Sequence, residues 1–169
     1  MNSPVLDAIY QRRSIRTFTS QPVGREQLHE IIKAGIWAPS GLNNQPWRFV
    51  TVTDPAMRAE IARETRYSHI VLAAPALIAV YLDEASMYDA VKDHQAAGAC
   101  IENMLLAAEA LGLGAVWLGQ ILQNKEKVRQ LLGLPAGLDL MAVIALGHPD
   151  RHDQQSSRKP LAHFLVKEV

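Results

Sequence analysis

Apolar residues recur along this chain with two different periods, and the alternation of these periods predicts interleaved helices and strands. Helical spacing of apolar positions predicts helices over residues 4–11, 25–37, 55–65, 93–111 and 125–132. Short extended or continuous apolar runs predict strands over residues 47–53, 76–82, 115–118 and 140–146. Since helices and strands alternate, we expect an α+β fold in which helices flank both faces of a mixed sheet.

The segment 93–111 is the most apolar of the predicted helices and should lie buried against another helix. Alanine and larger apolar residues form a wide band along it, and such a band favours close packing of two helices. Asp93 stands at its start, where we interpret it as a capping group, and Gly112 is a natural stop. Cys100 lies on the apolar band, so we predict a buried, unreactive thiol rather than a nucleophile.

The C-terminal residues combine features that do not fit one packed element. Residues 150–160 are too polar for a core, whereas Phe164, Leu165 and Val166 are apolar. An arm that crosses to a partner subunit would satisfy both requirements. We therefore expect a single domain, residues 1–169, whose residues 150–169 form a C-terminal arm.

Length and charge limit the kind of protein this can be. The chain has 169 residues, with 17 lysine and arginine residues against 17 aspartate and glutamate residues. This balance gives no overall field that would favour nucleic acid or an anionic membrane. One cysteine excludes an internal disulfide and a thiolate metal cluster. The longest apolar run, residues 71–82, is far shorter than the roughly 20 residues of a membrane span, and residues 1–5 lack a signal pattern, so we expect a cytoplasmic protein.

Residues 38–47 form the most unusual segment of the chain. Pro39 and Pro46 fix the backbone at two points, and Gly41 allows a sharp or left-handed bend. Short polar side chains between the prolines can donate and accept hydrogen bonds. We predict a rigid, amide-rich loop at the mouth of the sheet, suited to a flat heterocycle. An ordinary connection between a helix and a strand is the alternative.

Two basic segments near opposite ends of the chain could hold an anion. The first contains Arg12, Arg13, Ser14 and Arg16. In extended backbone, residues 12, 14 and 16 point to one side, and the planar fork of arginine matches the oxygens of a phosphate. The second segment, which could close the same site, contains Arg158 and Lys159. For Arg12 and Arg13 the alternative is a basic helix C-terminus stabilised by the helix dipole.

The remaining motifs do not form a catalytic cluster of side chains. Residues 112–120 are rich in glycine, but they do not form a G-x-G-x-x-G run that follows a strand and opens a helix. These glycines would let the backbone approach a planar ligand, or would form a structural turn. The six histidines show no zinc-binding spacing, and the chain has neither a P-loop nor a G-x-S-x-G motif. A phosphate site without an acid–base cluster indicates that a cofactor carries the reaction.

Taken together, these motifs resemble the FMN-dependent nitroreductase family, in a short, single-domain form. The matching motifs are, in order, residues 12–16 (RRSIR), 39–47 (PSGLNNQPW), 112–119 (GLGAVWLG), 147–149 (GHP) and 158–161 (RKPL). The resemblance spans nearly the whole chain. It implies an intertwined homodimer with FMN at each of two equivalent interface sites, and NADH or NADPH as the electron donor.

The resemblance also implies roles for particular residues. The FMN phosphate, ribityl chain and pyrimidine edge would be held by Arg12, Arg13, Ser14 and Arg16. The flavin would be reached from the other subunit by Pro39, Ser40 and Asn43. The isoalloxazine would be lined by backbone at Leu118, Gly119 and Gln120, and the phosphate would also be contacted by Arg158. The family often has a basic residue where this chain has Ser156, and Lys159 would substitute for it.

The function implied by the resemblance is that of an FMN-dependent NAD(P)H oxidoreductase. A hydride would pass through flavin N5 to nitroaromatic or quinone-like acceptors in a ping-pong cycle that needs no catalytic side chain and no metal. Met87 and Tyr88 are candidates for the roof over the flavin. Three alternatives stay open: other flavin chemistry of the superfamily, such as flavin fragmentation or dehalogenation, a flavin-binding dimer without turnover, and a dimeric interaction module that has lost flavin.

Overall fold

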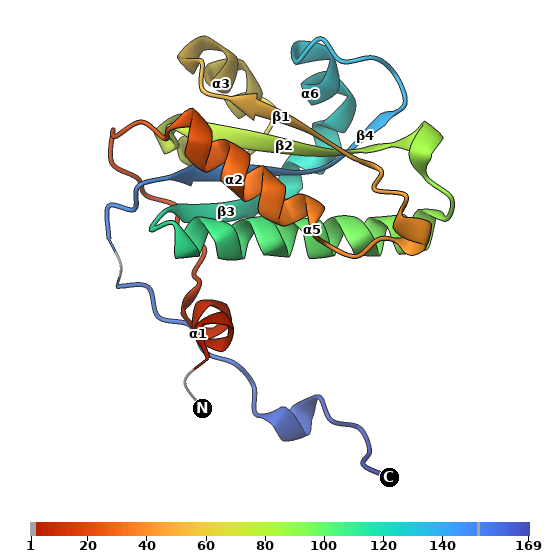
Figure 1. The fold of residues 1–169 in the computed structure, drawn as a ribbon. Helices are drawn as coiled ribbons and strands as arrows, with labels where there is room; N and C mark the ends of the chain where they lie inside the picture. Colours follow the sequence, from red (N-terminus) through yellow and green to blue (C-terminus); the bar gives the residue numbers. More distant parts are fainter. Residues whose placement is uncertain (1–2, 152) are drawn as a thin grey trace.

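The computed structural model describes residues 3–151 and 153–169, and its elements alternate as the sequence predicts (Figure 1). The helices are α1 (Pro4–Gln11), α2 (Arg25–Ile36), α3 (Pro55–Ala62), α4 (Ser68–Ala73), α5 (Ala90–Ala110) and α6 (Lys125–Leu131). The strands are β1 (Trp47–Val52), β2 (Ala76–Asp83), β3 (Gly114–Leu118) and β4 (Leu138–Gly147). Short 3₁₀ turns are η1 (Gly41–Asn43), η2 (Glu84–Ser86), η3 (Gln120–Asn124) and η4 (Leu161–His163). Residues 1–2 of the expected domain, and His152 among the histidines considered as ligands, lie outside the described residues.

The four strands form one sheet in the order β1-β2-β4-β3. All three pairs of neighbouring strands are antiparallel, with Phe49 opposite Val80 and Ile78 opposite Ile144. The α+β class is confirmed, but the sheet itself is not mixed. The parallel geometry is confined to a single bridge between Ser14 and Ala115, outside the named strands. This bridge attaches the segment after α1 to the free edge of β3.

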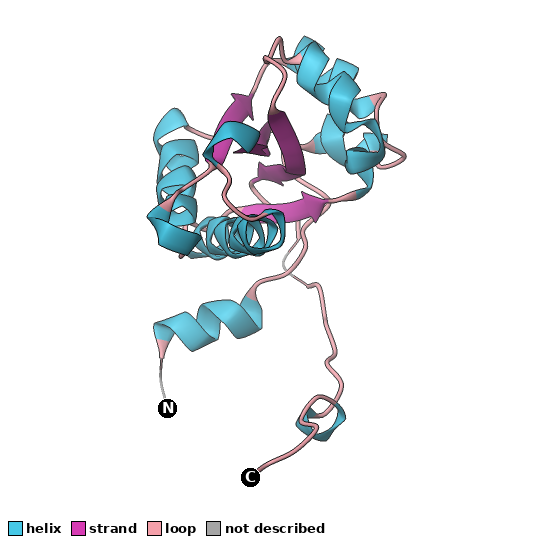
Figure 2. Ribbon diagram, turned by 90° about the vertical axis from the view of Figure 1, so that its right-hand side faces the viewer, coloured by secondary structure: helices cyan, strands magenta, loops and turns pink. Residues whose placement is uncertain are grey.

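Helices cover both faces of the sheet, as expected (Figures 1 and 2). Alternate residues of a strand point to opposite faces. Ile78 and Val80 of β2 therefore pack with α2 and α5, whereas Leu77 and Ala79 pack with α3, α4 and α6. Because both faces are buried, the whole of β2 is apolar, which is why its sequence shows a continuous run.

The long helix α5 packs against α2 at a glycine. A Cβ atom at Gly35 of α2 would lie 2.7 Å from Met104 Cγ and 3.1 Å from Cys100 Sγ, so the two helices approach closely there. The helix begins three residues before the predicted start, because the N-cap is Asp89, whose side chain accepts a hydrogen bond from Lys92 N. Asp93 is therefore not the cap. The predicted stop at Gly112 is confirmed, since this residue has the positive φ, 71°, that glycine tolerates.

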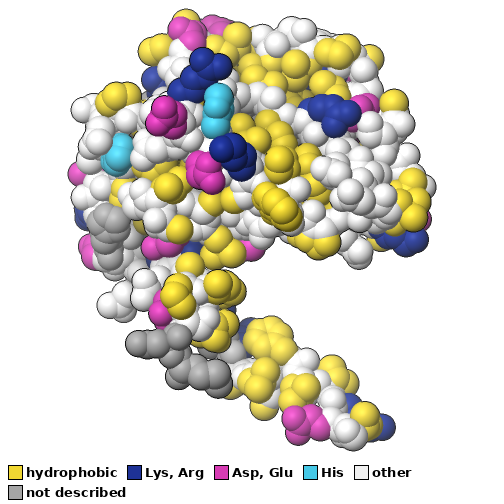
Figure 3. Space-filling view, in the orientation of Figure 1, with side chains coloured by type: hydrophobic (Ala, Val, Ile, Leu, Met, Phe, Trp, Pro, Cys, Tyr) yellow, Lys and Arg dark blue, Asp and Glu magenta, His cyan; other side chains and the backbone are white. Residues whose placement is uncertain are grey.

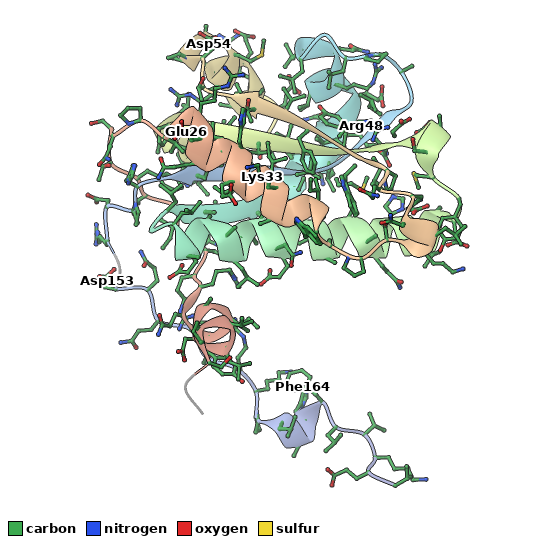
Figure 4. All side chains as sticks on the ribbon, viewed as in Figure 1. Glu26, Lys33, Arg48, Asp54, Asp153 and Phe164 are labelled. Carbon is green, nitrogen blue, oxygen red and sulfur yellow. The ribbon has the colours of Figure 1, made fainter. Side chains whose placement is uncertain are left out.

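The two ends of the chain lie apart from the packed body (Figures 1 and 2). Helix α1 has no buried residue among those described. The C-terminal arm, residues 153–169, is exposed along almost all of its length, and hydrophobic side chains line it (Figure 3). Phe164, labelled in Figure 4, lies on this arm apart from the packed body and is 62% exposed. Within the described residues, no helix has the length and apolar character needed to cross a membrane.

Candidate functional site

A cleft of about 400 Å³ collects the basic residues from both ends of the chain. Its lining consists of Arg12, Arg13, Ser14, Arg16, Gln154, Gln155, Ser156 and Arg158. We call this cavity the basic cleft. The two segments that the sequence suggested for one anion thus meet in space, with the exception of Lys159.

The backbone after α1 explains how the basic cleft is built. Ile15 N donates to Ala115 O at 3.0 Å, and Ser14 forms the parallel bridge to Ala115. Ile15 is buried against Gly114, where a Cβ atom would lie 2.6 Å from its side chain. Because neighbouring side chains of extended backbone point in opposite directions, burial of Ile15 turns Ser14 and Arg16 toward the cleft. Glycine at position 114 is required for this approach.

Some N–H groups of the arginines in the basic cleft make hydrogen bonds to described residues of the chain, and others do not. Arg13 Nη1 donates to the carbonyls of Tyr10, at 2.7 Å, and Arg12, at 2.9 Å, which agrees with the alternative that this residue closes the end of α1. Arg12 Nε lies 3.4 Å from the carboxylate of Glu102 on α5. The Nε atoms of Arg12 and Arg13 are nevertheless buried without a hydrogen-bond partner in the described part of the chain. Buried donors of this kind call for an acceptor, and a bound anion would supply one.

The C-terminal side of the basic cleft is held by local contacts. Arg158 Nη1 donates to Ser156 Oγ, and also to Ser157 O at 2.9 Å. Lys159 Nζ instead lies 3.0 Å from Nε2 of His163, outside the cleft lining. Within one chain, Lys159 therefore lies outside the cleft that contains Ser156.

A second cavity, of about 340 Å³, shares Arg16 with the basic cleft. Its lining consists of Arg16, Tyr67, Ile70, Val116, Trp117, Leu118, Gly119 and Gln120. We call it the β3 cavity, because the end of the edge strand β3 forms its floor. Arg16 belongs to both linings, so a ligand could extend from one cavity into the other. The sequence pointed to residues 118–120, but Tyr67 and Trp117 were not assigned.

The side chain of Gln120, at the rim of the β3 cavity, makes hydrogen bonds to a neighbouring turn. Gln120 Oε1 accepts hydrogen bonds from Thr65 Oγ1 at 2.7 Å and from Arg66 N at 2.9 Å. It thereby fixes the turn that leads to Tyr67 and α4. At Gly119 a Cβ atom would meet no atom within 4 Å, so the backbone there is open to a ligand.

The loop of residues 39–45 lies elsewhere. Pro39, Ser40 and Gly41 line a third cavity, of about 270 Å³, with residues of the first half of α5 such as Lys92 and Gln95. This lining shares no residue with the basic cleft or the β3 cavity. Within one chain, the structure therefore does not bring Pro39, Ser40 and Asn43 to the other candidate residues.

The region 84–92 also lies beside this loop rather than over the β3 cavity. The ring of Tyr88 packs onto Gly41, because a Cβ atom there would lie 1.9 Å from Tyr88 Oη. Neither Met87 nor Tyr88 lines the β3 cavity. As a roof over that cavity in the same chain, these two residues do not fit.

Cys100 lines none of these three cavities. Burial raises the pKa of the Cys100 thiol to about 12, as expected of an inert buried cysteine. Among the residues with described positions, no group of three or more histidine, cysteine, aspartate or glutamate side chains could hold a metal ion.

Comparison with known proteins assigns this architecture. The model of the nitroreductase family matches residues 9–66 and 59–148. The NADPH-flavin oxidoreductase of Vibrio harveyi is 34% identical over 180 residues, which cover 99% of this chain and 74% of that protein. The NADH dehydrogenase of Thermus thermophilus is 34% identical over 202 residues, covering 96% of this chain and 97% of that protein.

Solved structures give the same result. A protein of Desulfovibrio desulfuricans assigned as a nitroreductase and crystallised with FMN has a TM-score of 0.95 and 52% identity, covering 100% of this chain and 99% of that one. The NADPH:FMN oxidoreductase of Vibrio harveyi, complexed with NAD⁺, has a TM-score of 0.87 and 31% identity, covering 98% of this chain and 77% of that one.

Proposed function

The chain belongs to the nitroreductase family, and from this membership we propose that it is an FMN-dependent NAD(P)H oxidoreductase acting on nitroaromatic or quinone-like acceptors. One observation carries the proposal. A cleft lined by four arginines shares Arg16 with a neighbouring cavity that is lined by the end of an edge strand. A molecule with a phosphate at one end and a planar ring at the other matches that shape.

The residues present fit FMN. The phosphate would be held by Arg12, Arg13, Ser14 and Arg158, and the buried Nε of Arg13, which has no hydrogen-bond partner among the described residues, is a donor that a phosphate can satisfy. The ring would lie along Leu118 and Gly119, where open backbone allows close approach. Lys159, in contact with His163, is not part of this proposal.

Bound FMN supplies hydride transfer at flavin N5, and the protein supplies position and charge. Arg16 keeps a fixed positive charge where the two cavities join, which favours negative charge on a ring edge placed there. Val116 and Leu118 are buried apolar residues that keep water from the floor of the β3 cavity. We propose a ping-pong order, because donor and acceptor would occupy this one cavity in turn.

We also propose a single domain over residues 1–169 that works as a homodimer. Leu42 is 86% exposed at the tip of the 39–45 loop, and Phe164 and Val166 are 62% and 98% exposed on the arm of residues 150–169. Exposed apolar side chains at two projecting segments are typical of surfaces that a partner covers. In a dimer, the loop of one protomer would bring Pro39, Ser40 and Asn43 to the flavin of the other.

The test begins with the purified protein. It should be yellow, and NADH or NADPH should bleach its flavin bands without oxygen, after which a nitroaromatic or quinone acceptor should restore them. Colourless protein that FMN cannot reconstitute would overturn the proposal in favour of an interaction module. Yellow protein that neither nicotinamide reduces would favour a binder without turnover.

Arg16→Ala provides a sharper test of the site. We expect weaker FMN binding and a lower flavin reduction potential, because a positive charge beside the ring edge is lost. Arg25→Ala, which removes an exposed arginine at the start of α2, is the matched control and should leave both quantities unchanged. An unchanged potential in Arg16→Ala would remove this residue from the flavin edge.

A further inference from the structure

The loop of residues 40–45 keeps a backbone shape that its own residues disfavour. Leu42, Asn43 and Gln45 have positive φ angles of 53°, 55° and 46°. Residues with a Cβ atom avoid this region of backbone space. Leu42 is 86% exposed, so packing of its side chain within this chain does not hold the loop. Hydrogen bonds within the loop support this shape: Asn43 N donates to Ser40 O, Asn44 N to Gly41 O, and Gln45 N to Ser40 Oγ. Further contacts come from outside the loop.

The main contact comes from a buried carboxylate. Asp93, in the first turn of α5, is fully buried and accepts three hydrogen bonds. Its Oδ1 accepts from Asn44 Nδ2 at 2.8 Å, and its Oδ2 accepts from the backbone N–H groups of Tyr88 at 2.9 Å and Asp89 at 3.0 Å. Asn44 Nδ2 also donates to Ser86 O at 3.1 Å. One carboxylate thus ties the loop to the start of α5.

The hydrogen bond from Tyr88 N to Asp93 connects this carboxylate to the loop a second time. The Tyr88 ring covers Gly41 so closely that a Cβ atom there would lie 1.9 Å from the hydroxyl. Fixing the backbone of Tyr88 therefore fixes the group that covers the loop. Arg48, labelled on β1 in Figure 4, braces the same region, since it donates to Asp83 at 2.7 Å and to Ser86 Oγ at 3.3 Å.

We propose that Asp93 is a positioning residue for the flavin site. Through Asn44 and Tyr88 it holds residues 40–43 in the shape in which Ser40 and Asn43 contact the FMN of the partner subunit. Asp93 itself touches neither the flavin nor a substrate. This inference rests on the proposed function, because the loop serves the flavin only in an FMN-binding dimer.

Mutation can exchange the donor and the acceptor of the hydrogen bond between Asn44 and Asp93. Asn44→Asp places a second carboxylate against the first, which removes a charge-assisted hydrogen bond and adds repulsion. In the double variant Asn44→Asp/Asp93→Asn, the new amide at position 93 keeps one oxygen for the two backbone N–H groups and donates its own N–H to the new carboxylate. The bond between positions 44 and 93 returns with opposite polarity, whereas the hydrogen bond from Asn44 Nδ2 to Ser86 O is lost in both variants.

The experiment measures the dissociation constant of FMN by fluorescence titration of the apoprotein, together with its thermal unfolding midpoint. We expect FMN binding about tenfold or more weaker in Asn44→Asp, because a hydrogen bond to a charged group is lost, and tighter binding in the double variant than in Asn44→Asp, because one of the two lost contacts returns. Asp89→Ala is the control. It removes the cap of the same helix, to Lys92 N, but no contact with the loop, and should change affinity by less than about twofold.

The outcomes separate the two proposals. Wild-type protein that binds no FMN would refute the proposed function, and this inference with it. Normal wild-type binding with unchanged affinity in Asn44→Asp, or a double variant that binds FMN no more tightly than Asn44→Asp, would overturn the inference alone. If Asn44→Asp does not fold, Asn44→Ala takes its place, and an affinity equal to that of Asp89→Ala would overturn the positioning role.

Discussion

The buried carboxylate of Asp93 should also make the fold sensitive to acid. Burial raises the pKa of Asp93, but hydrogen bonds from Asn44 and from the backbone N–H groups of Asp89 and Tyr88 outweigh burial and hold the pKa below its ordinary value. Because the folded pKa lies below the unfolded one, the carboxylate stabilises the fold fully above pH about 4, and this contribution is lost as the pH falls through the folded pKa. Asp93→Asn should therefore flatten the acid side of a plot of unfolding midpoint against pH. Asp153→Asn, on the exposed arm, should leave that plot unchanged, and an equal response of the two variants would contradict the assignment (Figure 4).

Cys100 supports a second prediction at the scale of one residue. Its thiol is fully buried, and burial raises its pKa to about 12, so at neutral pH the reactive thiolate is scarce and the sulfur is inaccessible. A thiol reagent such as 5,5′-dithiobis(2-nitrobenzoate) should react only as fast as the protein unfolds. Reaction that stays fast in native conditions, and does not accelerate in denaturant, would show that the thiol is exposed in solution.

At the scale of elements, the contact between α2 and α5 depends on Gly35. A Cβ atom there would approach Met104 Cγ to 2.7 Å, so Gly35→Ala should destabilise the protein by about 1–3 kcal/mol, as overpacking of a core does. Gly98→Ala, on α5 itself, meets no atom within 4 Å and should raise helix stability by about 0.5–1 kcal/mol. Urea unfolding of both variants measures the difference. A gain of similar size in both would mean that helix propensity, rather than packing, decides the effect of Gly35→Ala.

The same elements show which helices and strands could be predicted from the sequence. The apolar run of β2 and the small-residue band of α5 carry strong patterns, because burial on a sheet or against a helix leaves few choices of residue. The start of α5 was predicted three residues late because Asp93 was interpreted as the capping group, whereas the N-cap is Asp89. Helix α4 was not predicted at all, since Ser68–Ala73 is too short for its apolar residues to reveal a period.

The candidate site could be predicted where its residues lie close together in the sequence. Arginines grouped within residues 12–16 indicated an anion site, and the structure adds the pairing with β3 that turns Arg16 toward it. The contribution of Tyr67 could not be predicted, because it depends on the turn that Gln120 holds from 55 residues away. Lys159 faces His163 because the direction of a side chain in an irregular segment is set by its neighbours in space.

At the scale of the whole molecule, the residues of the proposed site lie in two separate places on one chain. The basic cleft and the β3 cavity lie beside β3, whereas Ser40 and Gly41 line a separate cavity at the start of α5. A two-fold axis would bring the loop of each protomer to the cavities of the other, and would do so twice. The proposed homodimer therefore accounts for the position of the loop, for its exposed Leu42 and for the extended arm with one arrangement.

The arm gives this arrangement its most direct test. Leu161, Phe164 and Val166 are 74%, 62% and 98% exposed, so deleting residues 161–169 removes little packing within the chain. The far-ultraviolet spectrum should therefore persist in the truncated protein, while dimer dissociation becomes easier because the apolar arm no longer covers the partner. Sedimentation equilibrium should give twice the chain mass of 18.7 kDa for the chain of residues 1–169, and a mass that falls toward one chain on dilution for the truncated form.

Lys167→Ala, at the exposed end of the same arm, is the control and should dimerise as wild type does. A truncated protein that stays dimeric at every concentration would restrict the interface to the packed body, and a single-chain mass for the chain of residues 1–169 would remove the dimer altogether.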